Sequence, residues 1–375
     1  MPRMNVAIDA RALHEGRTGI GVYTEAMVRG LAGLPGVGVT LFSPRAIPGA
    51  ALLPARVEAP SGGPRWGTVW VQTSLARAVG RADCDVLLSA VTIAPARSSV
   101  PTVPVVHDLT PLTHPQWHRP KTVTAFVPWI EKTLERAARI IAVSHATAEE
   151  LRRRYPEIRS RISVVPHGVD PRFSPDAPEG ERERARSAWA GGRPYLLFLG
   201  TLEPRKNLRT LVAACEELWQ RRPSTPDLVL AGGPGWKSRP LLEAISRSPF
   251  RERIHLPGYV RDEDAPSLLR SAEVFCYPSL AEGFGLPVLE AMACGTPVVI
   301  SDAPGLREVA GDAASPVPAE DPPALAAAIE RLLDDDAWRS EAVGCGRDRA
   351  RAHSWEDAAE KTASILREAC GAGPA

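Results

Sequence analysis

The sequence predicts an α/β protein made of two doubly wound domains, each a parallel sheet flanked by helices. Short apolar runs alternate with longer helical patterns twice along the chain, whose 375 residues are too many for one ordinary core. Most of the short runs are continuously apolar rather than alternating, as strands buried on both faces must be. Such sheets bind ligands at the carboxyl ends of their strands, so we expect the site in the cleft between the two domains.

Runs rich in β-branched and aromatic residues mark the expected strands. In the first half they cover residues 5–10, 37–42, 85–90, 102–108, 139–144 and 162–166. In the second half they cover residues 195–200, 227–232, 253–258, 274–279 and 297–302. A helix over 207–222 repeats apolar residues such as Leu208, Leu211 and Cys215 at helical spacing, and Asn207 is placed to cap its start.

A segment rich in proline, glycine and charge separates the two alternating regions. Residues 171–194 carry no strand pattern and predict an exposed linker with solvated arginines that leads into a short helix. A further amphipathic helix over 353–369 follows the second region. We therefore expect one domain at 1–170 together with 355–375, and the other at 171–354.

Charge is balanced over the whole chain but not along it. The net charge of +1 shows that the molecule is not a polyelectrolyte, and we expect no nucleic-acid partner. Residues 1–170 hold 20 Lys and Arg against 13 Asp and Glu, whereas residues 171–375 hold 25 against 31. A basic first half suggests that it alone meets an anionic partner, with a plainly solvated surface as the open alternative.

Cysteines and apolar runs indicate the compartment. The six cysteines form no CxxC pair and several sit in apolar runs, which fits small buried side chains in a reducing cytosol. The N-terminus enters a strand at once without a signal-peptide pattern, and no apolar run approaches the roughly 20 residues that span a bilayer. We expect a cytoplasmic protein, with peripheral contact at the inner face of the membrane through Arg152, Arg153 and Arg154 left open.

The loop after the first strand reads RTGIGVYT, at residues 17–24. Gly19 and Gly21 precede a helix and would let backbone N–H groups approach a phosphate at the helix N-terminus. A nicotinamide cofactor would require a third glycine and an acid at the end of the second strand. Thr24 stands at the glycine position and no acid follows the strand, so a dehydrogenase is disfavoured.

The loop after the fourth strand reads VVHDLTPLTHPQWHRP, at residues 105–120. His107 and Asp108 end a buried strand, where a polar pair is costly unless it faces a cleft. We expect His107 to act as an acid or base or to orient a substrate hydroxyl, rather than to be a structural histidine. His114 and His118 follow, but without the helical spacing of a metal site, so we expect no metal.

Two cations stand at the start of a predicted helix in the second half of the chain. Arg205 and Lys206, in GTLEPRKNL, stand beside a helix N-terminus, where positive charges oppose the helix dipole. This mismatch favours an anionic partner, and two cations with free helix N–H groups suit a diphosphate.

Two carboxylates flank a glycine turn in AEGFGLPVLEAMACG, at residues 281–295. Glu282 lies in the turn with Gly283 and Gly285, and Glu290 is expected in the first helical turn, after a proline suited to the helix start. A carboxylate can accept two vicinal hydroxyl groups. Two carboxylates around a phosphate-binding helix start thus suggest polyols at both ends of a diphosphate, which describes a nucleotide sugar.

These segments together resemble glycosyltransferase family 4, retaining nucleotide-sugar transferases of the GT-B fold, and especially its mannosyltransferase-like members. The resemblance runs over essentially the whole length through GIGVYT, VVHDLTPLTHP, AVSHATAEEL, VVPHGVD, GTLEPRKNL, AEGFGLPVLEAMACGTPVV and the SWEDAA helix. It implies two Rossmann-like domains with sheets facing across a cleft. The N-terminal domain, completed by the returning C-terminal helix, would hold the acceptor, and the C-terminal domain the nucleotide sugar.

The resemblance also implies roles for single residues. Glu282 and Glu290 match the family's paired acids, on the donor sugar and on the ribose respectively. Arg205 and Lys206 match its basic pair on the diphosphate, and His107 would lie at the anomeric centre. The remaining donor-binding positions would be Gly19, Gly21, Tyr259, Val260, Phe284, Gly285 and Leu286.

The chain departs from the family in one stretch, where His167 in PHGVD replaces a common asparagine. It lies near the expected hinge and does not affect the assignment. The aromatic residues Trp66, Trp70, Trp117 and Trp129 fit either core packing or an acceptor surface.

The resemblance implies retaining transfer of a hexose from a nucleotide sugar, with no cofactor. We expect GDP-mannose as donor, with UDP- and dTDP-sugars open, and a carbohydrate, lipid-linked or small-molecule acceptor. The alternatives are a sugar-nucleotide epimerase of the same fold or a non-catalytic nucleotide-sugar-binding subunit.

Overall fold

Two sheets, each entirely parallel, organise the residues that the computed structural model describes, which are 3–13, 18–58 and 67–372. They belong to two units with separate cores, residues 1–168 with 354–375, and residues 169–353. We refer to these as unit 1 and unit 2. Two parallel sheets with helices between their strands confirm the predicted α/β class.

Unit 1 contains a seven-stranded sheet in the order β3-β2-β1-β4-β5-β6-β7. Its strands are β1 (Met4–Asp9), β2 (Val37–Phe42), β3 (Arg56–Glu58), β4 (Val86–Ser89), β5 (Thr102–Val106), β6 (Ile140–Ala142) and β7 (Ile162–Val164). Its longer helices are α1 (Gly19–Gly33), α5 (Pro120–Arg136), α6 (His145–Arg154) and α15 (Trp355–Ala372). Shorter ones are α2 (Gly67–Trp70), α3 (Ala76–Arg81) and α4 (Thr110–Thr113), with η1 (Arg11–Leu13), η2 (Ala50–Leu52), η3 (Val71–Leu75), η4 (Pro115–Trp117) and η5 (Pro156–Arg161).

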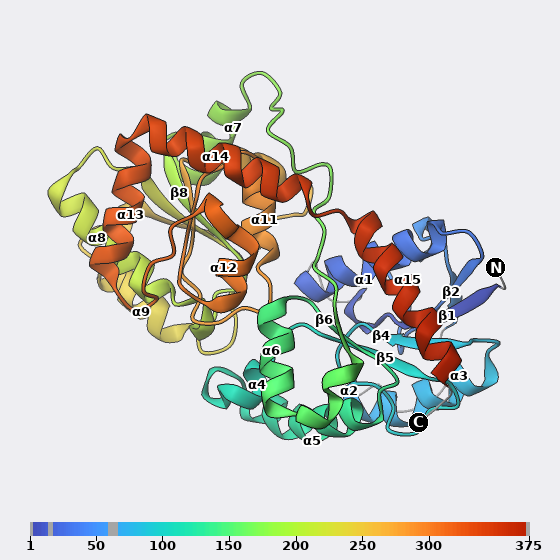
Figure 1. The fold of residues 1–375 in the computed structure, drawn as a ribbon. Helices are drawn as coiled ribbons and strands as arrows, with labels where there is room; N and C mark the ends of the chain where they lie inside the picture. The colour runs from blue at the N-terminus through green and yellow to red at the C-terminus, as the bar shows by residue number, and fades with distance from the viewer. Residues whose placement is uncertain (1–2, 14–17, 59–66, 373–375) are drawn as a thin grey trace. The chain divides into compact units, whose positions relative to one another are not determined.

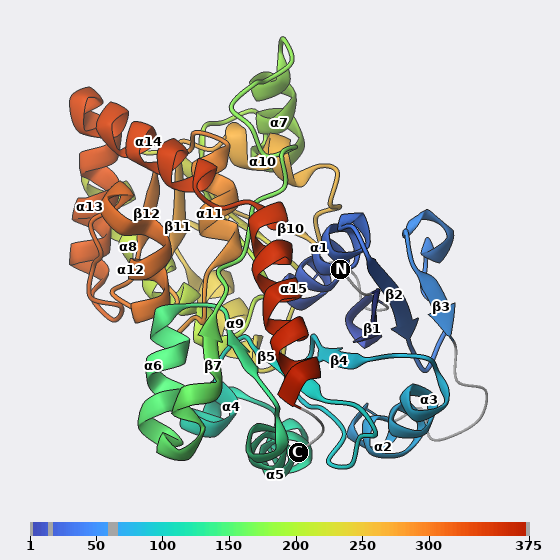
Figure 2. The same ribbon diagram turned by 45° about the vertical axis from the view of Figure 1, so that its right-hand side comes forward.

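The C-terminal helix α15 is part of unit 1, where it packs along α1 and against β4 and β5 (Figures 1 and 2). The contact is close because a Cβ added at Gly30 of α1 would lie 2.5 Å from the Cβ of Ala359. Another part of the core joins Trp70 from α2, Val106 from β5 and Leu134 from α5. The order β2-β1-β4-β5 brings the carboxyl ends of β1, β4 and β5 to neighbouring positions at one edge.

Unit 2 contains a five-stranded sheet in the order β10-β9-β8-β11-β12. Its strands are β8 (Tyr195–Leu199), β9 (Asp227–Ala231), β10 (Ile254–Gly258), β11 (Val274–Tyr277) and β12 (Val298–Ile300). Its helices are α7 (Glu181–Ala190), α8 (Leu208–Arg221), α9 (Arg239–Arg247), α10 (Ala265–Arg270), α11 (Leu286–Ala293), α12 (Pro304–Ala310), α13 (Pro322–Asp334) and α14 (Asp336–Arg351), with η6 (Pro204–Lys206), η7 (Arg251–Arg253) and η8 (Gly311–Ala313). Helices α8 and α13 pack together, as do α11 and α14 (Figure 1).

The segment expected to be an exposed linker is largely part of unit 2. Its helix α7 packs against α10, β9 and β10. Arg186 donates to the carboxylate of Glu273 at 2.8 Å, and Arg172 forms an ion pair with Asp262. The prediction of solvated arginines was therefore wrong for these two, because opposite charges on the unit's own surface hold them.

The strand predictions hold in position and err at the ends. The short strand β3 was missed, and most strands end one or two residues earlier than expected, so His107 and Asp108 follow β5 instead of closing it. Asn207 precedes α8, but its side chain donates to the carbonyl groups of Pro278 and Ala319 and caps no helix N–H. The amide thus links two loops, and its oxygen accepts from the Thr210 hydroxyl in the first turn of α8.

Trp66 lies outside the described residues. Trp70 is buried in the core of unit 1, and Trp117 stacks on His114 with ring centroids 4.0 Å apart. No helix within the described ranges combines the length and apolar character needed to cross a membrane.

Candidate active site

A cluster of charges lies where β8 and β11 end, side by side in the sheet of unit 2. The turn η6 after β8 carries Arg205 and Lys206, and the loop after β11 carries Glu282. The Arg205 Nη1 lies 2.7 Å from one Glu282 oxygen, and the Lys206 Nζ lies 2.5 Å from the other. The structure thus brings together three of the predicted site residues, with side chains exposed by 14% or less.

The two cations determine the ionisation of Glu282. Burial alone would raise the pKa of this carboxyl group, but Arg205 and then Lys206 outweigh it and hold the pKa at about 2. Burial lowers the pKa of Lys206, and the nearby Arg205 lowers it further, against the attraction of Glu282. Glu282 is therefore ionised at neutral pH and lies between the two cations.

Hydrogen bonds tie the two loops to each other. The Lys206 ammonium group donates to the Tyr277 hydroxyl at 2.6 Å and lies 4.7 Å from the centre of the same ring. Arg205 donates from its side chain to the carbonyl oxygen of Ala281, and its own carbonyl oxygen accepts from the Leu280 N–H. Both cations are held in place before any ligand binds, which lowers the reorganisation needed for binding.

Glu203 also belongs to the cluster, although no role was predicted for it. One of its oxygens accepts from the Arg205 Nε at 3.1 Å and from the Arg205 Nη2 at 2.8 Å. Its side chain is 3% exposed, and burial raises its pKa although Arg205 and Lys206 oppose this. The sequence signal that could have identified Glu203 is its position two residues before Arg205.

Glu203 and Glu282 also correct one argument from the sequence. We expected the mismatch of two cations with the helix dipole to favour an anionic partner. The protein itself supplies two carboxylates, so the cations are balanced within the described structure. The mismatch alone does not demand a ligand.

Of the two glycines in the turn before α11, Gly285 has a backbone conformation that favours glycine, and Gly283 does not. Gly285 has a φ of +110°, and a Cβ there would lie 2.7 Å from the Leu306 Cδ2. Gly283 is not among the residues with a positive φ. Glu290 is the fifth residue of α11 and is 9% exposed, so the expectation that it lies in the first turn was wrong.

The other predicted donor-binding residues of unit 2 are less closely grouped. Phe284 and Leu286 are buried beside the turn, at 5% and 8% exposure. Tyr259 and Val260 follow β10, the edge strand, which lies two positions from β8. Tyr259 is 58% exposed, and Val260 is buried.

In unit 1, His107 lies directly after β5 and its ring nitrogen Nε2 is 2.9 Å from the carbonyl oxygen of Ala90, after β4. A carbonyl oxygen only accepts, so Nε2 carries the proton and Nδ1 is the acceptor of the neutral ring. Burial lowers the pKa of His107 against the influence of the Ala90 carbonyl and Asp108, which favours this neutral form. The geometry suits orientation of a hydroxyl group better than donation of a proton.

An aromatic cluster packs around His107. The ring centroid of Tyr23 in α1 lies 5.1 Å from that of His107 in an edge-on arrangement, and that of His167 lies 5.6 Å away. Trp355, the first residue of α15, lies 5.5 Å from His167. Sequence reasoning set His167 aside as a hinge residue and missed Tyr23, since no local pattern connects four segments so far apart in the chain.

The two glycines after the first strand lie within a helix, whereas we expected them to precede it. Gly19 and Gly21 are the first and third residues of α1, whose start is capped by the Thr18 hydroxyl accepting from the Gly21 N–H. A Cβ at Gly21 would lie 3.0 Å from the carbonyl oxygen of Ala12, so a side chain there would crowd the helix start. Asp108 accepts from the N–H and the hydroxyl of Thr110 and so holds its own loop.

Comparisons with known proteins identify the family. The model described as "Glycosyltransferase Family 4" matches residues 17–173, and that described as "Glycosyl transferases group 1" matches residues 179–349. An O-antigen chain mannosyltransferase B of Escherichia coli is 35% identical over 263 residues, covering 69% of this chain and 68% of the relative. The chain belongs to glycosyltransferase family 4.

A further relative is similar in sequence, and solved structures show the GT-B fold. A D-inositol 3-phosphate glycosyltransferase of Salinispora tropica is 33% identical, over 74% of this chain and 61% of the relative. The structure of sucrose-phosphate synthase from Thermosynechococcus elongatus superposes with a TM-score of 0.79 at 22% identity, covering 99% of this chain and all of the other. Anabaena HepE in complex with UDP and glucose gives a TM-score of 0.78 at 19% identity, with 97% and 99% coverage.

Proposed function

We propose that this family 4 enzyme is a retaining hexosyltransferase that moves mannose from GDP-mannose to a hydroxyl group of a glycan or lipid-linked acceptor. The observation that carries the proposal is the buried cluster of Arg205, Lys206 and Glu282 at the carboxyl ends of β8 and β11. Cations fixed in a site of low dielectric constant are suited to stabilise a diphosphate on which charge develops. Removing one such donor typically costs about 10²–10³ in rate.

The carboxylate has a second task in this proposal. When the donor diphosphate reaches Arg205 and Lys206, it shares the two cations with Glu282. The Glu282 oxygens then have acceptor capacity for hydroxyl groups of the donor sugar, since a carboxylate offers about four lone-pair sites. Glu290 accepts from the ribose hydroxyls, and the turn at Gly285 lets the backbone approach the donor.

Unit 1 contributes His107 and the acceptor in this proposal. The Nδ1 of the neutral imidazole accepts from a hydroxyl group of the donor sugar, while the Ala90 carbonyl fixes the ring through Nε2. The C–O bond from the anomeric carbon to the diphosphate breaks, and the electron pair leaves with the diphosphate. The acceptor oxygen then bonds to the anomeric carbon on the same face, and its proton passes to the departing diphosphate.

Several relatives favour mannose as the transferred sugar. Besides the O-antigen enzyme, the serotype-specific mannosyltransferase WbdA of Escherichia coli is 30% identical, and a phosphatidyl-myo-inositol mannosyltransferase of Mycolicibacterium smegmatis is 33% identical. The matched region covers 29% of WbdA and 60% of the mycobacterial enzyme. The HepE complexes contain UDP, so the base must be tested directly.

The test is a panel of GDP-mannose, UDP-glucose, ADP-glucose and dTDP-glucose. Thermal stabilisation identifies the nucleotide, and NMR of the glycosidic product identifies the anomeric configuration. The proposal predicts the largest stabilisation by GDP-mannose and an α-linked product. Stabilisation by none of the four, or a β-linked product from an α-linked donor, would contradict it. Interconversion of the free nucleotide sugar without an acceptor would point to an epimerase.

A further inference from the structure

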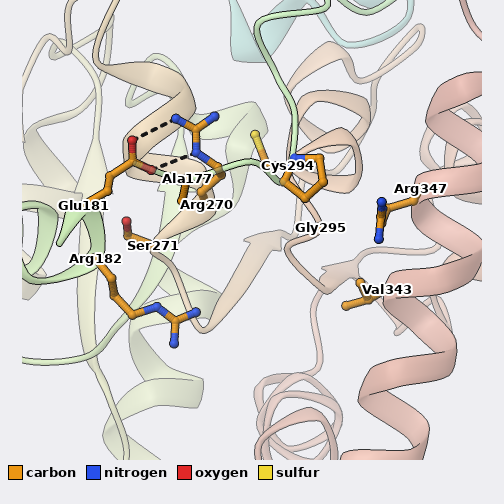
Figure 3. Close-up of a pocket in the computed structure, with 10 residues that line it drawn as sticks. Ala177, Glu181, Arg182, Arg270, Ser271, Cys294, Gly295, Val343 and Arg347 are labelled. Atoms are coloured by element: carbon orange, nitrogen blue, oxygen red, sulfur yellow. Dashed lines mark hydrogen bonds and ion pairs between the residues drawn. The ribbon is translucent and has the colours of Figure 1, made fainter. Parts of the chain in front are cut away.

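A pocket of about 260 Å³ lies within unit 2 (Figure 3), and the residues that line it include none of those predicted for the donor site. One lining residue, Cys294, is close to Glu290, whose carbonyl oxygen accepts from the Cys294 N–H. Its walls come from the first turn of α7, the end of α10, the residues that follow α11, and α14. The charged side chains in the lining are Glu181, Arg182, Arg270 and Arg347.

One of the three arginines in the lining donates hydrogen bonds within the protein from all three of its side-chain nitrogen atoms. The Nε and Nη2 of Arg270 donate to the two oxygens of Glu181 at 2.8 and 2.9 Å, and its Nη1 donates to the Ser174 carbonyl. This pair is 10–11% exposed and forms a neutral, rigid wall of the pocket.

The other two arginines have no such partner. Within the described residues, no ion pair or side-chain hydrogen bond of Arg182, which is exposed, or of Arg347, which is half-buried, is found. Arg182 comes from α7 and Arg347 from α14, and Figure 3 shows them entering the space from different sides. Two unpaired guanidinium groups thus face one hollow.

Other charges around the pocket largely cancel. The N-terminus of α7 contributes up to roughly half a positive charge, and the C-terminus of α11, beside Cys294, contributes a similar negative one. Burial raises the pKa of the Cys294 thiol to about 12, so it stays neutral at pH 7. Asp176 lies near Arg270 but is exposed and outside the lining. The lining therefore carries a net charge of +2, three arginines against Glu181.

We propose that this pocket is a second anion site, which binds a phosphate group of a small molecule through Arg182 and Arg347. Guanidinium groups match the oxygens of a phosphate in geometry and charge. The Glu181–Arg270 pair limits the site on one side, and its neutrality leaves the charge of the other two arginines uncompensated. The proposal does not depend on the donor or the acceptor of the glycosyl transfer.

The test measures binding of inorganic phosphate by calorimetry to the whole protein and to three variants. R182Q/R347Q removes both proposed contacts, and R184Q/R351Q removes the same charge from exposed positions of the same two helices. Lys206→Met weakens phosphate binding at the proposed donor site. We expect R182Q/R347Q to lose at least about tenfold in affinity, as expected for lost hydrogen bonds to a charged group. Binding in R184Q/R351Q and a binding component in Lys206→Met should persist.

Three results would overturn the proposal. One is no phosphate binding by the unaltered protein. The second is an equal loss in R182Q/R347Q and R184Q/R351Q, which would show that overall charge alone attracts the ion. The third is binding that only Lys206→Met removes, which would assign all of the phosphate to the donor site. Thermal unfolding of each variant checks that it folds, which we expect because the R182Q/R347Q change breaks no ion pair within the described residues.

Discussion

Glu282→Gln is the most informative single substitution, because the structure gives the expected size of its effect on stability. Glutamine keeps the shape of the side chain and removes its charge. The change removes the carboxylate that contacts both Arg205 and Lys206, whereas the Glu203 carboxylate still contacts Arg205. Breaking a buried ion pair by removing one partner typically costs about 3–5 kcal/mol.

The pKa of Glu282 gives an independent value. A pKa of about 2 in place of 4.5 means that the folded protein favours the ionised carboxylate by roughly 3 kcal/mol, at about 1.4 kcal/mol per pH unit. For a domain of 150–250 residues, 1 kcal/mol shifts the melting temperature by about 2–4 °C. We therefore expect Glu282→Gln to lower the melting temperature of unit 2 by about 6–12 °C at pH 7.

The pH dependence has a defined sign. Because the folded pKa lies below the unfolded one, the contribution of Glu282 is complete above about pH 4.5 and is lost as the pH falls toward 2. Calorimetric unfolding at pH 7 and pH 3 should thus show a difference between wild type and Glu282→Gln that shrinks by about half or more at pH 3. Glu243→Gln, which removes an exposed carboxylate paired with Arg239, serves as the control and should cost under about 1 kcal/mol. A Glu282→Gln effect no larger than the control, or one that is unchanged at pH 3, would refute this reasoning.

Three further changes follow from the same structure. Glu203→Gln should lower turnover about tenfold with little loss of nucleotide affinity, because it loosens the neighbouring guanidinium group; unchanged steady-state rates would show that Glu203 positions nothing. His107→Gln should lower kcat and abolish the acid limb of the pH profile of kcat. We expect this limb below pH 6.5, because burial lowers the pKa of His107. An acid limb that persists in the variant would belong to another group. Gly285→Ala should destabilise the fold by about 1–3 kcal/mol, because the φ of Gly285 is +110° and the new Cβ would meet Leu306. Gly33→Ala is the control and should not destabilise the fold, because the space around Gly33 is open. Equal denaturant midpoints for the two variants would contradict the strain at Gly285.

The fold was predictable because its signals are local. Continuous apolar runs identify strands buried on both faces, and the order of strands and helices then leaves few topologies. The strand β3 escaped because its three residues are exposed or half-buried and carry no apolar pattern. The linker 171–194 was misjudged for a related reason, since two of its arginines, Arg172 and Arg186, pair with the acids Asp262 and Glu273, which lie 90 and 87 residues away.

The candidate site was predictable only where residues stand next to each other or in a recognisable motif. Arg205, Lys206 and Glu282 were found in this way, whereas their mutual ion pairs depend on how the ends of β8 and β11 meet. His167 packs against His107 across 60 residues, and Tyr23 does so across 84, and no sequence spacing encodes such contacts. Glu203 was overlooked because an acid beside an arginine is common on protein surfaces.

The central claim is that Arg205 and Lys206 bind the diphosphate of the donor. The most direct measurement is the affinity for GDP of the wild type and of Lys206→Met, by calorimetry, with Lys361→Met as the control, since Lys361 is exposed and paired with Asp357 in α15. The account predicts a loss of about 10–100-fold for Lys206→Met, as expected for a lost hydrogen bond to a charged group, and no change for the control. Equal affinities for GDP in all three proteins would contradict it.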